Sequence, residues 1–110
     1  MFQEKQLGQS RINGTTATSV YSPAVGVTAI IKTIYIANQS GSADTYRLFV
    51  DDDGTTYDQT TALFYDIVIE ADETLQIDTF IAMNDPSGNV AFQNGTANAL
   101  TITLFGAEIT

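Results

Sequence analysis

The carboxylates are the side chains of this sequence with the most potential for chemistry. Its 110 residues include 13 Asp and Glu against four Lys and Arg, with no His and no Cys. Catalysis by a Ser-His or Cys-His pair needs a base or thiolate that this composition lacks. A glycosidase needs two carboxylates across a cleft, for which a domain of this size has little room. We therefore expect no catalytic residues and a protein that is not an enzyme.

The acidic run 51–54, Asp-Asp-Asp-Gly, is the cluster that most suggests a metal ion. A calcium loop of the EF-hand type places acids at positions one, three and five and a glycine at position six. Counting back from the glycine, position one is Phe49, which offers no ligand atom, and position twelve is Thr60 instead of Glu. A looser site that includes Asp58 stays open as an alternative. We expect no metal and no cofactor, and we interpret the run as a solvated hairpin turn.

The net charge of −9 restricts the classes of partner. A surface of this sign repels phosphate backbones and anionic lipids, so we expect no nucleic acid and no membrane as a partner. Nowhere do eighteen apolar residues follow one another, and the first ten residues lack the apolar run of a secretory signal. The expected setting is a soluble compartment.

The stretch 29–38 is the clearest strand, because it is rich in β-branched and aromatic residues and has no Gly or Pro. By the period of two, Ile30, Ile34 and Ile36 share one face, and Ile31 and Tyr35 lie on the other. Because neither face is polar, we place this strand in the middle of a sheet.

Further strands are expected between turns rich in Gly, Pro, Asn and Asp. They cover 16–22, 45–50, 63–70, 75–79 with a possible extension to 83, 90–92 and 99–109. No segment has the period of a helix. About seven or eight strands at this spacing predict an all-β fold, an antiparallel β-sandwich that is jelly-roll-like and forms a single domain over 16–110.

Residues 1–15 are predicted to be an extended N-terminal arm outside that domain. The first eleven residues contain two bases, Lys5 and Arg11, and one acid, Glu4, so they carry a net charge of +1. The remainder, with two bases and twelve acids, carries −10. The segment is either a frayed terminus or an arm that lies on acidic surface, with Phe2 and Leu7 as its apolar contacts.

Five aromatic residues fall opposite the side chains assigned to the core: Tyr35, Phe49, Phe64, Phe80 and Phe105. They form either a second layer of the core or a patch that a monomer would not leave bare. Together with Phe2, Lys5, Leu7 and Arg11 they are our candidates for a subunit interface, and we expect a homo-oligomer, a dimer or trimer.

The layout from residue 7 to 109 resembles small virion proteins of tailed bacteriophages. The segments that carry the likeness are Tyr21-Ser22-Pro23, the strand 30–38, the turn 71–74 and the closing 105–109, Phe-Gly-Ala-Glu-Ile. The resemblance implies a capsid decoration (cement) protein that binds and bridges major capsid protein subunits and stabilises the head. Its expected location is the capsid surface of the virion, after synthesis in the host cytoplasm.

Two alternatives stay open. A phage tail or fibre component would share the same fold and partners among other virion subunits. A carbohydrate-binding module would instead use Tyr35, Tyr57 or Tyr65 to stack on sugar rings, and its aromatic residues would surround one concave site.

Overall fold

The computed structural model describes all 110 residues and consists of strands, turns and loops. It contains no helix long and apolar enough to cross a membrane. The eight strands are β1 (Phe2–Arg11), β2 (Thr18–Tyr21), β3 (Thr28–Asn38), β4 (Asp44–Asp51), β5 (Ala62–Ile69), β6 (Thr74–Met83), β7 (Asn89–Asn94) and β8 (Leu100–Ile109).

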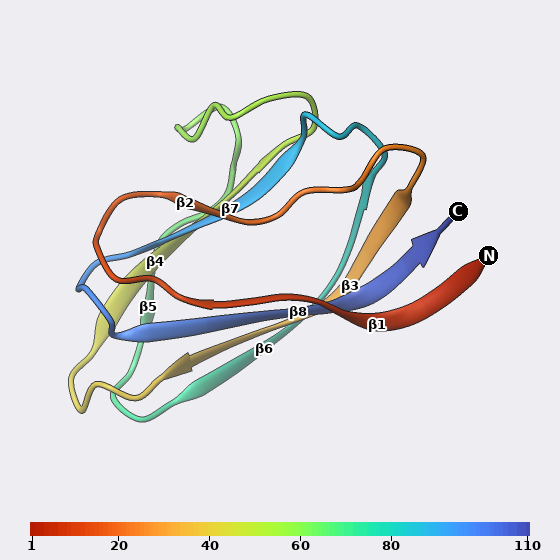
Figure 1. The fold of residues 1–110 in the computed structure, drawn as a ribbon. Coiled ribbons are helices and arrows are strands. Elements are labelled where there is room, and N and C mark those ends of the chain that lie inside the picture. Colours follow the sequence, from red (N-terminus) through yellow and green to blue (C-terminus); the bar gives the residue numbers. More distant parts are fainter.

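The strands form two four-stranded sheets, sheet A in the order β1-β8-β3-β6 and sheet B in the order β2-β7-β4-β5. All pairs are antiparallel, and β1 pairs with β8, β2 with β7, β3 with β6 and β4 with β5. The chain is thus one long hairpin rolled up on itself, which is the jelly-roll arrangement. Figure 1 shows β1 and β8 side by side, with both termini at one end. The predicted all-β sandwich is confirmed.

The core lies between the two sheets. Side chains that alternate along each strand meet there, as the period of two requires. The predicted inward residues Leu100, Ile102 and Leu104 of β8 are buried, and so are Tyr46 and Leu48 of β4. Each large apolar side chain contributes about 1.5–3 kcal/mol when fully buried. This core holds the sheets together without a disulfide.

A bulge in β3 changes the predicted assignment of its faces. The pairing register shifts between Ile31 and Thr33, so the residues with no exposed surface are Ile31, Ile34 and Ile36. Ile30, predicted to point inward with Ile34 and Ile36, is half-buried on the opposite face. One additional residue in a strand moves every side chain that precedes it to the opposite face of the sheet.

Residues 2–11 are an edge strand of sheet A and not a separate arm. Nine of them pair in register with β8, with an irregularity around Leu7. Leu7 packs against the core, and Ile12, just after the strand, is buried. The segment is extended as predicted, but the domain begins with it and the expected boundary at residue 15 is wrong. The physical reason is that β8 would otherwise expose a full row of unpaired backbone groups.

Candidate functional site

Four of the nine predicted interface residues gather on the outer face of sheet A: Phe2, Tyr35, Phe80 and Phe105. We call this set the aromatic face. Phe80 is 71% exposed, Phe2 55% and Phe105 38%. Tyr35 on β3 and Phe105 on β8 meet edge to face, with ring centroids 5.8 Å apart and an interplanar angle of 87°. The aromatic residues therefore belong to different strands but to one side of the molecule.

One ion pair lies on this side, beside Phe2, whereas the exposed carboxylate of Asp78 on β6 has no basic partner. Lys32 lies 3.2 Å from a carboxylate oxygen of Glu4, and its ammonium group is 5.4 Å from the centroid of the Phe2 ring. An exposed pair of this kind contributes only about 0–1 kcal/mol to stability. It leaves the aromatic face without a net local charge from these two residues.

Two of the predicted aromatic residues do not belong to the aromatic face. Phe49 is only 1% exposed, because the loop after β4 covers it and Tyr57 of that loop lies 6.1 Å away between ring centroids. Phe64 packs against the core, 6.2 Å from the ring of Tyr46. Asp66 has a positive φ of 54° and lies at a shift in the β4–β5 register. This irregularity turns Phe64, which precedes it in β5, to the face opposite the predicted one.

The remaining three candidates make contacts within the chain. Lys5 lies 3.0 Å from a carboxylate oxygen of Glu108, Arg11 donates from Nε to the carbonyl oxygen of Asn98 at 2.9 Å, and Leu7 faces the core. Glu108 also accepts a hydrogen bond of 2.6 Å from the hydroxyl of Tyr21 on sheet B. The bond from Tyr21, followed by that from Lys5, lowers the pKa of the Glu108 carboxyl. This group ties the two sheets together.

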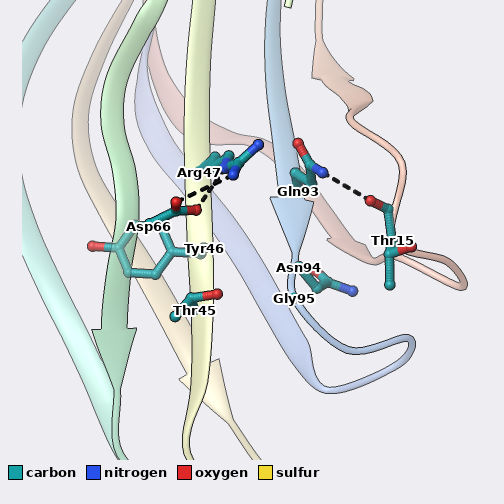
Figure 2. Close-up of a pocket in the computed structure, with 8 residues that line it drawn as sticks. All are labelled: Thr15, Thr45, Tyr46, Arg47, Asp66, Gln93, Asn94 and Gly95. Carbon is teal, nitrogen blue, oxygen red and sulfur yellow. Dashed lines mark hydrogen bonds and ion pairs between the residues drawn. The ribbon is translucent and has the colours of Figure 1, made fainter. Parts of the chain in front are cut away.

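The outer face of sheet B carries a row of polar side chains (Figure 2). Arg47 on β4 lies between Asp66 of β5 and Gln93 of β7. Its guanidinium donates from Nε and Nη2 to the two carboxylate oxygens of Asp66, at 2.6 and 3.2 Å. These bonds lower the pKa of the Asp66 carboxyl. Gln93 donates from Nε2 to the carbonyl oxygen of Thr15 at 2.9 Å. The row borders a pocket of about 200 Å³.

A second pocket, of about 460 Å³, adjoins Arg47 on the side of the long loop. Its walls include Tyr57, Asp58, Gln59 and Thr60 of that loop and Tyr65 of β5. The guanidinium carbon of Arg47 stands 3.9 Å from the centroid of the Tyr65 ring, within the range of a cation–π contact. We call the two pockets together the tyrosine recess.

Tyr57 and Tyr65 of the tyrosine recess were singled out by sequence as sugar-stacking candidates, and Asp58 only as a possible metal ligand. Tyr35, the third stacking candidate, lies on the other sheet. The roles of Arg47, Asp66 and Gln93 were missed. Arg47 and Gln93 are paired in the sheet although 46 positions separate them in the chain, and the strand order that joins them is not visible in local patterns.

The acidic run forms a cluster in which the carboxylate oxygens of Asp51, Asp52 and Asp53 lie within 4.8 Å of one another. Asp51 accepts backbone N–H bonds from Thr56 at 2.8 Å and from Asp53 at 3.3 Å. These bonds lower the pKa of the Asp51 carboxyl. The residue ties the loop to the end of β4, and Asp58 of the looser alternative site lies outside the cluster.

No protein-family model matches this chain, and no curated protein matches its sequence. Among solved structures, it is similar to a chain in the structure of the Gx strain of infectious bursal disease virus, with 8% identity and a TM-score of 0.44. The similarity to a chain of the Gt strain has 12% identity and a TM-score of 0.34. The matches cover 98% and 96% of this chain and 30% of each viral chain. The assignment of the fold rests on the strand order and not on these likenesses.

Proposed function

We propose that this protein is a non-catalytic structural component of a virus particle and docks on a neighbouring protein subunit through the aromatic face. The observation that carries the proposal is the concentration of Phe2, Tyr35, Phe80 and Phe105 on one side of sheet A. Large aromatic side chains exposed together are typical of protein interfaces.

The energetics suit a protein partner. An aromatic side chain buries about 150–250 Å² when it is covered, and a standard interface removes about 800 Å² from each partner. Because the four side chains are already partly covered, with Phe80 the most exposed at 71%, they supply about half of such an interface, and the polar side chains around them complete it.

The finer proposal is a capsid decoration protein that bridges major capsid protein subunits on the outside of the head. Its support is the resemblance to small virion proteins of tailed phages, together with a jelly roll, a fold that capsid proteins commonly use. A tail or fibre component is the alternative within the particle, and it would use the same face.

The test is binding to particles of the virus assembled without this protein. Phe80→Ser should weaken binding about tenfold or more, because Phe80 is the most exposed aromatic residue of this face and truncating an anchor residue of an interface costs about 2 kcal/mol or more. Val25→Ser is the matched control, since Val25 is also apolar and 85% exposed but lies in the loop between β2 and β3, outside both the aromatic face and the edge strand β5.

Equal thermal stability of the two variants would show that both remain folded. Equal binding by wild type and Phe80→Ser would contradict the proposal, and so would an equal loss in both variants. Imaging the decorated particle would then distinguish the head from the tail.

A further inference from the structure

We infer that the tyrosine recess on sheet B binds a neutral oligosaccharide. This site is separate from the aromatic face, because the two surfaces are the outer faces of opposite sheets. The inference therefore does not depend on the proposed docking function, and the two can fail independently.

The size and position of the recess fit a small ligand. Its pockets of about 460 and 200 Å³ share Arg47, so together they lie within the range of about 300–1,000 Å³ that small-molecule sites occupy. Rigid strands β4, β5 and β7 form the floor, and the loop after β4 forms one wall. Figure 2 shows how Arg47 and Gln93 line the smaller pocket from neighbouring strands.

The recess combines an apolar platform with unused hydrogen-bonding groups. The guanidinium of Arg47 covers one face of the Tyr65 ring, so the platform consists of Tyr57 and the remaining surface of Tyr65, which is 37% exposed. Aromatic residues offer such surface to the C–H faces of sugars. Within the protein, only Oδ1 of Asp58 accepts hydrogen bonds, from the backbone N–H and the hydroxyl of Thr60. The side chain of Gln59 makes no hydrogen bond. Gln93 donates through Nε2 and leaves its side-chain oxygen free. Planar amide and carboxylate groups of this kind can each bond two neighbouring hydroxyls of a saccharide.

The charges favour a neutral ligand. The two hydrogen bonds from Arg47 to Asp66 neutralise its guanidinium, and Asp58 adds a negative charge to the rim. On a chain of net charge −9, an anionic saccharide or a nucleotide would be repelled.

The other ligand classes fit less well. A largely apolar ligand would leave the charged and amide groups of the recess desolvated and unpaired. An extended peptide would add to the free edge of β5, outside the recess, because β4 beneath the recess is paired on both sides, with β5 and β7. A polyhydroxylated ligand fits better, because its hydroxyl groups pair with the charged and amide groups of the recess and it needs no free strand edge.

The experiment is a titration of the full chain with four neutral oligosaccharides, in which the backbone amide NMR signals are monitored. The four are maltohexaose, cellohexaose, laminarihexaose and chitohexaose. At least one of the four should shift the signals of residues 57–60, 65 and 93 and leave those of β1 and β6 unchanged. Tyr65→Ala should weaken binding about tenfold, which corresponds to about 1.4 kcal/mol. Tyr35→Ala, which removes the same side chain from sheet A, should leave the affinity unchanged.

Gln59→Ala is a second variant, since it removes a side chain without internal contacts and so tests the site without disturbing the fold. The inference is overturned if none of the four sugars shifts these signals. It is also overturned if Tyr65→Ala and Tyr35→Ala bind the sugar equally well. Particle docking by Phe80→Ser and by Tyr65→Ala, measured in parallel, distinguishes a failure of this inference from a failure of the proposed docking.

Discussion

Gly106 lies where β8 passes the bulge of β3, opposite Ile31 in the register. A Cβ at this position would overlap with the carbonyl oxygen of Ile30, which belongs to the backbone and cannot move aside. We expect Gly106→Ala to lower the free energy of unfolding by about 3 kcal/mol, as measured by urea titration. Gly14→Ala is the control, because nothing lies within 4 Å of the Cβ it would add. Similar stabilities of the two variants would show that the strands separate without cost.

Glu108 links Tyr21 and Lys5, and these partners lower the pKa of its carboxyl. A carboxyl whose pKa is lower in the folded than in the unfolded protein stabilises the fold above the unfolded pKa. That contribution is lost as the pH falls through the folded pKa. Glu108→Gln should therefore be less stable than wild type by about 1 kcal/mol at neutral pH. The difference in stability should begin to shrink as the pH falls below about 4.3, the ordinary pKa of a glutamate, and should vanish below the folded pKa.

Thermal unfolding across this pH range measures the effect. Glu4→Gln is the matched control, because Glu4 also pairs with a lysine but its side chain is 66% exposed. It should change the stability by less than about 0.5 kcal/mol. A gap between wild type and Glu108→Gln that stays constant into strong acid would exclude the titration of Glu108 as its cause.

Single residues were predicted well where the strand was regular. Leu100, Ile102 and Leu104 point inward as expected, because β8 has no irregularity before Gly106. Phe64 was misplaced because a period of two cannot detect the bulge at Asp66. Phe49 has the predicted outward direction, and only the tertiary position of the following loop buries it.

Strand β1 is the element that sequence reasoning described least well. Its residues are mostly Gln, Lys, Glu and Ser, since an edge strand exposes most of its side chains, so it lacks the apolar alternation that identified the other strands. Strands β3 and β8 were predicted within a residue at each end, and β6 was predicted over 75–79 with its extension to 83 left open, because their apolar residues recur on a buried face. The pairing of the first strand with the last is a long-range property without a local signal.

Deletion of residues 1–11 should destabilise the isolated protein. The truncated chain loses the backbone hydrogen bonds to β8, worth about 0.5–1.5 kcal/mol net each, and the packing of Leu7. We expect a loss of at least about 3 kcal/mol in chemical unfolding. The double variant Lys5→Ala/Arg11→Ala keeps the strand and should cost much less, because exposed charge contacts are worth about 0–1 kcal/mol each. Unchanged stability after the deletion would show that β1 is a dispensable arm.

At the scale of the whole molecule, the jelly roll separates two outer faces of different chemistry. Sheet A presents exposed aromatic rings, whereas sheet B presents a polar recess with two tyrosines. The sequence contained both sets of residues, but only the rolled topology assigns each set to a face. This separation allows docking and ligand binding to be tested with variants that do not disturb each other.

The open edges of the two sheets differ in how they are protected from pairing with other chains. β1 carries Glu4 and Lys5, β6 carries Asp78, and β2 is only four residues long. The only charged residue of β5 is Asp66, and Arg47 binds it, whereas Leu63 and Val68 are 53% and 55% exposed. An apolar edge without a free charge favours pairing with another strand.

We therefore expect self-association through β5, with antiparallel pairing of two copies over the short stretches on either side of the bulge at Asp66. Sedimentation at micromolar concentration should give a mass above the 11.8 kDa of one chain. Val68→Lys should shift the protein to monomer, because a lysine on an edge strand opposes pairing. Thr74→Lys adds the same charge to the exposed start of β6 and should leave the association unchanged. A wild-type protein that sediments as a monomer would show that the bulge is enough to protect this edge.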